Sequence, residues 1–164
     1  MSFLSRLLPR RARPSPAGET SLAPGQWANM LIPAVDQPYS NRALEVAYRL
    51  AEGTQTRIQL AYIIEVPRIL PLDAALPDAE SVAANALNIA ERAAVPYKVQ
   101  VESIIHRTRK AKERILTLIT EEHIDLLVLG GRPDRLRGLS SDLTRELFLA
   151  APCEVIVDYI ANEK

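Results

Sequence analysis

The chain has 164 residues, and its 20 basic and 20 acidic side chains give a formal net charge of zero. This length fits one domain with a substantial core, and the charge balance gives no indication of a nucleic-acid partner. No apolar run approaches the roughly 20 residues that a membrane-spanning helix requires. A single cysteine excludes an internal disulfide, and with two histidines it offers too few ligands for most metal sites. We expect a single-domain cytoplasmic protein without a metal.

Residues 1–29 differ in composition from the rest of the chain. They hold four prolines, four arginines and one glutamate. Such a stretch buries too little apolar surface to offset the entropy lost on ordering it, so we interpret 1–29 as a disordered arm. Residues 30–164 then form the folded domain. The more apolar beginning, residues 1–13, leaves open a membrane contact or a docking peptide, although a solvated tail is the favoured interpretation.

Strand-like and helix-like segments alternate from Met30 onward. Strands are expected at 30–35, 57–66, around 99–103, at 125–129 and at 155–157, with helices beginning near Ser40, Asp78, Ala111 and Ser141. The first and fourth strands are uninterrupted apolar runs, typical of strands buried on both faces. This order predicts a five-stranded parallel α/β sheet with helices on both faces. Ligands of such sheets bind outside the carboxyl ends of the strands, where the strand order reverses.

Two further patterns concern the middle of the chain. The second helix has apolar positions at helical spacing, which we expect to face the core: Val82, Ala86, Ile89 and Ala93. A basic run follows the third strand: Arg107, Arg109, Lys110, Lys112 and Arg114. This run could steer an anionic partner. Because glutamates lie nearby, the exposed face of a helix is the favoured interpretation.

Three segments resemble the universal stress protein family. Residues 31–36, followed by Ser40, resemble the family's opening strand and helix, 125–130 its fourth strand, and 151–157 its final Ala-Pro-Cys strand. The resemblance covers roughly residues 30–160. It implies a Rossmann-like fold with strand order 3-2-1-4-5 and homodimers that pair through the last strand. The residues of that strand are Val155, Ile156 and Val157, and an unprotected edge strand favours pairing independently of the resemblance.

Many members of this family bind ATP, and the resemblance implies how. An aspartate that ends strand one holds the adenosine. A later segment binds the phosphates through backbone N–H groups; its pattern is Gly-x-x-Gly, then nine residues, then Gly-Ser/Thr. Asp36 and Gly130 match the aspartate and the first glycine. Pro133 replaces the second glycine and has no N–H to donate. The place of the final Gly-Ser/Thr pair falls on Ser141-Asp142 when it is counted back from Pro152, and on Leu143-Thr144 when it is counted forward from Gly130. Neither register supplies a glycine.

The candidate nucleotide-binding residues lie around the point where the strand order reverses, toward the carboxyl ends of the strands. They are Pro33, Ala34, Asp36, Ile63, Gly130, Gly131, Arg132, Ser140 and Ser141. Arg132, Arg135 and Arg137 crowd the loop after the fourth strand, and arginine is a strong bidentate partner of phosphate. The favoured interpretation is that Asp134 and Asp142 pair with these arginines on a solvated loop.

No nucleophile, base and orienting group occur together in a recognisable motif, so the sequence does not indicate an enzyme. We expect a non-enzymatic stress-response or regulatory protein with a degenerate ATP-binding motif. It would act as a dimeric interaction module whose client is a protein such as a membrane transporter. The alternative is a sensor that binds ATP, another adenine nucleotide or another small anion in the cleft between strands one and four.

Overall fold

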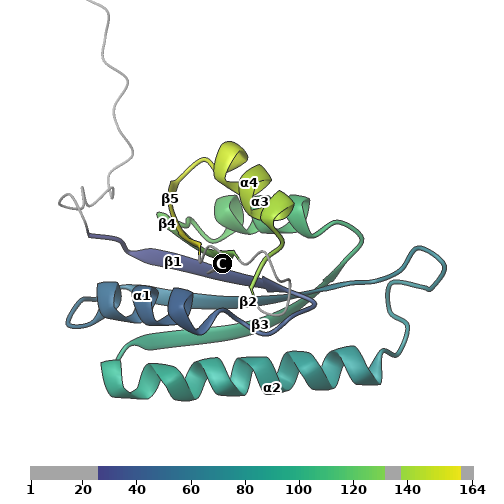
Figure 1. The fold of residues 1–164 in the computed structure, drawn as a ribbon, viewed down its shortest axis with the longest axis horizontal. Coiled ribbons are helices and arrows are strands. Elements are labelled where there is room, and N and C mark those ends of the chain that lie inside the picture. The colour runs from purple at the N-terminus through teal and green to yellow at the C-terminus, as the bar shows by residue number, and fades with distance from the viewer. Residues whose placement is uncertain (1–25, 132–137, 160–164) are drawn as a thin grey trace, which may run out of the picture.

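The computed structural model describes residues 26–131 and 138–159 (Figure 1). The elements are β1 (Asn29–Val35), α1 (Asn41–Ala51), β2 (Arg57–Glu65), α2 (Pro77–Ala94), the 3-10 helix η1 (Val95–Tyr97), β3 (Gln100–Thr108), α3 (Ala111–Glu121), β4 (Leu126–Gly131), α4 (Ser141–Ala150) and β5 (Glu154–Tyr159). All strands are parallel, in the order β3-β2-β1-β4-β5. The expected fold class and strand order are confirmed.

Helices cover both faces of the sheet. α1 and α2 pack on one face, and α3 and α4 on the other (Figure 1). Side chains of a strand alternate between the two faces, so Ile32 of β1 packs toward α1 and α2 whereas Leu31 packs toward α3 and α4. The central strands β1 and β4 are buried almost throughout, which explains their uninterrupted apolar sequences.

Serine caps fix where two helices begin. The Oγ of Ser40 accepts a hydrogen bond from the N–H of Ala43 at 3.4 Å, and the Oγ of Ser140 accepts one from the N–H of Leu143 at 3.2 Å. These bonds use N–H groups that have no partner inside the helix. Both helices therefore start at the carboxyl edge of the sheet, beside the ends of β1 and β4.

The expected core-facing stripe of α2 is wrong. The helix buries Ala83, Ala86, Leu87, Ala90 and Ala94. Of the expected stripe only Ala86 is buried, whereas Val82 and Ile89 are 44% and 48% exposed. The face of α2 that packs on the sheet thus consists of four alanines and Leu87, and Val82 and Ile89 lie beside it. Asp78 is also not the N-cap, because Leu76 holds that position and Pro77 opens the helix.

The described chain makes contacts before β1 begins. Trp27 and Ala28, which we placed in the arm, bind the domain: Trp27 Nε1 donates to Glu154 at 3.1 Å and the Ala28 N–H donates to Asp125 at 2.8 Å. The remainder of the expected arm, residues 1–25, lies outside the described residues, and its disorder stays a prediction. In the part of the chain that the structure describes, no helix has both the length and the apolarity needed to span a membrane.

Candidate functional site

A cavity of about 660 Å³ lies at the carboxyl edge of the sheet. Its described lining comprises Val35, Asp36, Gln37, Glu65, Arg109, Lys110, Ala111, Lys112, Glu113, Gly138, Ser140, Asp142, Leu143 and Glu146. These residues come from the ends of β1 and β2 and from the starts of α3 and α4. The volume falls within the range of about 300–1,000 Å³ that is usual for small-molecule sites.

Asp36 is held firmly at the wall of this cavity. It follows β1 with a positive φ of 51°. Its N–H donates to the Ile63 carbonyl at 3.0 Å, and its Oδ1 accepts from the Glu65 N–H at 3.1 Å. Burial raises the pKa of Asp36 above its ordinary value, and the negative charge of Glu65 raises it further, against the lowering by the Glu65 N–H. Asp36 is therefore placed to accept from a hydroxyl or amino group rather than to face another anion.

Gly130 and Gly131 have packing roles. A Cβ on Gly130 would lie 2.5 Å from the Cβ of Ser40 and 2.8 Å from the Cβ of Ala43. A Cβ on Gly131 would lie 3.1 Å from atoms of both Thr144 and Tyr159. The missing side chain at Gly130 thus lets the start of α1 pack directly against β4, which explains that glycine without any bound phosphate.

The segment that leads into α4 closes over the ends of β1 and β4. The Gly138 N–H donates to the Pro38 carbonyl at 2.8 Å, and the Leu139 N–H donates to the Gly130 carbonyl at 2.7 Å. Gly138 has a φ of 76°, and a Cβ there would lie 2.2 Å from the Gly130 oxygen. Two backbone donors at the reversal point are therefore occupied by carbonyl groups of the protein itself.

Carboxylates outnumber cations in the described lining of the cavity. The acidic residues are Asp36, Glu65, Glu113, Asp142 and Glu146, and the basic residues are Arg109, Lys110 and Lys112. Both lysines are paired, each with a glutamate at 3.4 Å. Like charges repel strongly where solvent is partly excluded, so this lining disfavours a ligand with several negative charges. Within the described ranges, no three His, Cys, Asp or Glu side chains group closely enough to hold a metal ion.

For two members of the basic run, the expected exposed helix face is wrong. Arg107 lies in β3 and Arg109 lies just before α3. Arg109 donates to the Leu70 carbonyl at 2.6 Å, and Arg107 donates to the Leu72 carbonyl at 3.0 Å and pairs with Glu80 at 2.6 Å. The two guanidinium groups hold the loop between β2 and α2, and this structural role takes up their donors.

The candidate nucleotide-binding residues occupy different surroundings. Asp36 and Ser140 line the cavity. Five others are buried within strands: Pro33, Ala34, Ile63, Gly130 and Gly131. Ser141 lines a separate surface groove over α4 and β5. Arg132, like Arg135 and Arg137, lies outside the described residues.

Sequence reasoning missed several residues of the cavity. Glu65 ends β2 and so shares the sheet edge with Asp36; comparing the ends of all strands would have found it. Lys112 and Glu146 meet at 3.4 Å from helices α3 and α4. No local pattern predicts such a pair, because it depends on how two helices pack.

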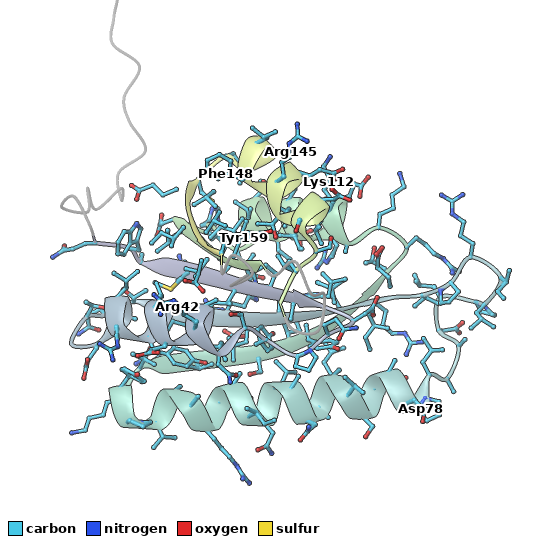
Figure 2. The ribbon with its side chains drawn as sticks, viewed as in Figure 1. Arg42, Asp78, Lys112, Arg145, Phe148 and Tyr159 are labelled. Atoms are coloured by element: carbon cyan, nitrogen blue, oxygen red, sulfur yellow. The ribbon has the colours of Figure 1, made fainter. Side chains whose placement is uncertain are left out.

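The last strand has an open edge and an apolar surface beside it. Among the described strands, β5 pairs only with β4, and Val155, Ile156 and Val157 are partly exposed. Phe148 of α4 and Tyr159 of β5, both labelled in Figure 2, are 55% and 49% exposed. They line a predominantly apolar groove of about 410 Å³. The open strand edge and the apolar groove therefore lie side by side, since Val157 and Tyr159 of β5 line the groove.

Comparison with known proteins links this fold to one family. The sequence profile of the Universal stress protein family matches residues 27–158. No curated protein sequence matches the chain. Similar structures include a universal stress protein from Archaeoglobus fulgidus, with a TM-score of 0.64 and 14% identity over 80% of this chain and 98% of that one.

Some of the similar structures contain a bound nucleotide. The Archaeoglobus fulgidus protein in complex with dAMP has a TM-score of 0.62 and 13% identity, covering 79% of this chain and 95% of that one. A family protein from Arabidopsis thaliana with AMP bound has a TM-score of 0.56 and 12% identity, covering 80% and 92%. At such identities these likenesses concern the fold, and the family is shown by the profile match. The chain belongs to the universal stress protein family.

Proposed function

We propose that this protein is a non-enzymatic regulatory member of the family that does not bind ATP tightly and acts as a dimeric interaction module. One observation carries the proposal. The N–H groups of Gly138 and Leu139 bond to the carbonyls of Pro38 and Gly130. Both donors lie between β4 and α4, beside the cavity, and their bonds within the protein leave them unable to bind a phosphate there.

The expected loss of affinity is large. A hydrogen bond to a charged group contributes about 1.5–3 kcal/mol. Losing two or more such bonds weakens binding by about a hundredfold or more relative to an intact motif. The excess of carboxylates in the described lining of the cavity, including Asp142 in the first turn of α4, acts in the same direction.

The proposed dimer forms through β5. An exposed strand edge presents unpaired backbone groups, and proteins normally protect it with charged residues, proline or a bulge. The three central residues of β5, Val155, Ile156 and Val157, carry no such protection. A two-fold axis beside the strand would pair it with its own copy and bury the neighbouring Phe148 and Tyr159. A client protein would then bind another surface of the dimer.

A second candidate function is a sensor for an adenine nucleoside monophosphate. It is supported by the position of Asp36 on the cavity wall, where its carboxylate can accept hydrogen bonds from ribose hydroxyls. The solved relatives with dAMP and AMP add support. A monophosphate brings fewer negative charges than ATP to the acidic lining, so it is tolerated better.

The nucleotide content of the purified protein separates these candidates. The full chain is denatured, and the released small molecules are identified by chromatography and mass spectrometry, with Asp36→Ala purified in parallel. We expect no nucleotide at a stoichiometric level in either protein. Stoichiometric AMP that is absent from Asp36→Ala would support the sensor, and stoichiometric ATP would overturn the main proposal.

A further inference from the structure

The apolar groove over α4 and β5 has a candidate occupant in the chain itself. Figure 2 labels three of the residues that line it, Arg145, Phe148 and Tyr159. Phe148 and Tyr159 are about half exposed, and Leu149, the residue after Phe148, is 71% exposed. Large apolar side chains that border a hollow on a soluble domain often form a binding surface.

A short apolar run lies near the beginning of the sequence, before the described residues. Phe3, Leu4, Leu7 and Leu8 have the spacing that places side chains on one side of a helical turn. Amphipathic segments of this kind bind apolar grooves through residues at positions i, i+3 and i+4, and Leu4, Leu7 and Leu8 have this spacing. Between residues 9 and 25 the only large apolar residue is Leu22. The run at residues 3–8 is therefore the part of the arm that is suited to a groove.

The run is tethered close enough to reach the groove. Trp27 Nε1 donates to Glu154, the first residue of β5, and Val157 lies about 10 Å further along that strand at 3.3 Å per residue. Leu8 is eighteen residues before Gln26, where the described chain begins. A flexible tether of that length spans about 20–25 Å on average and up to about 60 Å when extended. It can therefore pass the end of β5 from the face of the sheet where Trp27 packs to the face of the groove.

The charges of the segment and of the groove surface are opposite in sign. Residues 1–17 contain four arginines and no acidic residue, whereas residues 30–164 have 16 basic and 19 acidic side chains. The two elements that form the groove, α4 and β5, together carry one basic residue, Arg145, and four acidic ones, Asp142, Glu146, Glu154 and Asp158. Complementary charges of this kind favour the encounter and the orientation of the two partners.

We propose that the apolar run of residues 3–8 docks in the groove over α4 and β5 of its own domain and competes there with a second copy of the chain. A tether gives the run a local concentration in the millimolar range, whereas a second copy is present at micromolar concentration. Docking that would be weak between separate molecules is therefore sufficient. The docking stands independently, and its effect on assembly rests on the proposed dimer through β5.

Docking should weaken the dimer by a factor that can be measured. If the run is docked half of the time, each of the two protomers can pair only half of the time, so the dissociation constant of the dimer rises about fourfold. A full chain with both Leu4→Ser and Leu7→Ser keeps all four arginines but loses the apolar run. We expect sedimentation to give a dimer that is about fourfold tighter, or more. Leu22→Ser is the matched control and should leave the dissociation constant unchanged.

A monomeric background tests the docking itself. Ile156→Lys should prevent pairing of β5, and Ile156 does not belong to the described lining of the groove. Thr144 and Val157 do line the groove, and their methyl groups give separate NMR signals. We expect these signals to shift when Leu4→Ser and Leu7→Ser are added to Ile156→Lys, because the apolar run then leaves the groove.

Two controls locate the effect. The methyl signals of Val82 and Ile89 on α2, away from the groove, should not shift when the two leucines are replaced. Leu22→Ser should shift none of the four residues' signals. Because the docking is within one chain, the differences should be the same at low and at high protein concentration.

Unchanged signals of Thr144 and Val157 after loss of the two leucines would overturn the docking. Shifts that grow with protein concentration would also overturn it, because they would place the segment on a second copy. A dimer dissociation constant that does not fall with Leu4→Ser and Leu7→Ser would rule out the competition. A chain that is monomeric at every concentration, with and without these two substitutions, would overturn both the proposed dimer and the competition, and the methyl signals would still decide the docking.

Discussion

The Gly138 N–H donates a 2.8 Å hydrogen bond to the carbonyl of Pro38, a residue one hundred positions earlier in the chain. This bond ties the entry to α4 onto the segment that joins β1 to α1. Together with the hydrogen bond from the Leu139 N–H to the Gly130 carbonyl, it means that two backbone N–H groups near the point where the strand order reverses are already bonded within the protein. In the described lining of the cavity beside them, five carboxylates stand against three cations, which disfavours a phosphate.

Replacing Gly130 should destabilise the fold. In Gly130→Ala the new Cβ would overlap Ser40 and Ala43, so α1 must move away from β4. We expect urea unfolding to show a loss of about 1–3 kcal/mol. Gly131→Ala is the control, because its neighbours at 3.1 Å belong to side chains that can adjust, and its loss should be smaller. Equal stability of Gly130→Ala and the unmodified protein would refute the packing role.

Arg109 should support the loop between β2 and α2. Arg109→Lys keeps the charge but loses the planar fork that reaches several carbonyls. We expect a loss of about 1–2 kcal/mol and faster hydrogen exchange in residues 66–76. Lys110→Ala is a suitable control, since it removes only an exposed ion pair with Glu113 and should change stability little. Unchanged exchange in Arg109→Lys would rule out this role.

Asp36 should lower stability at neutral pH. Its folded-state pKa is raised, mainly by burial, so the folded protein holds the proton more tightly than the unfolded chain. Above the raised pKa the carboxylate is charged, and this charge lowers the stability of the folded protein. The loss of stability decreases as the pH falls through the raised pKa toward the ordinary pKa of an aspartate. Asp36→Asn keeps an acceptor for the Glu65 N–H and tolerates the positive φ.

We therefore expect Asp36→Asn to be more stable than the unmodified protein at about pH 7, with the difference shrinking toward about pH 4. Urea unfolding across this range measures it. Asp73→Asn, on an exposed loop, controls for the change in net charge. A stability difference that grows as pH falls would contradict the direction of the pKa shift.

Much of the fold could be predicted from local sequence, and the exceptions have physical reasons. Strands β1 and β4 are recognisable as apolar runs, and the caps at Ser40 and Ser140 mark the helix starts within one residue. The buried face of α2 could not be predicted from large apolar residues. The buried face consists mainly of alanines, which give a weaker hydrophobic signal in the sequence than Val82 and Ile89 do.

The candidate site was less accessible to sequence reasoning. Asp36 could be placed at the cavity because it directly follows β1. The bond from Gly138 to Pro38 and the arginine contacts to the loop after β2 could not, because they join segments far apart in the chain. Gly130 shows why a matched motif residue is ambiguous: a glycine that would admit a phosphate also admits a tightly packed helix.

The open edge of β5 should make the protein a dimer. We expect light scattering at micromolar concentration to give twice the chain mass. Ile156→Lys should give a monomer, because it places a charge in the middle of the unprotected strand. Ile69→Lys, on a residue that is 91% exposed in a loop, should remain dimeric. A monomeric mass for the unmodified chain would show that the edge does not pair.

Calorimetric titration with ATP and magnesium, on the unmodified chain and on Asp36→Ala, tests the absence of tight ATP binding most directly. The backbone donors of Gly138 and Leu139 are already bonded, and carboxylates outnumber cations in the described lining of the cavity, so we predict no submicromolar binding by either protein. A submicromolar dissociation constant for the unmodified protein that is lost in Asp36→Ala would contradict this prediction and establish the cavity as an ATP site.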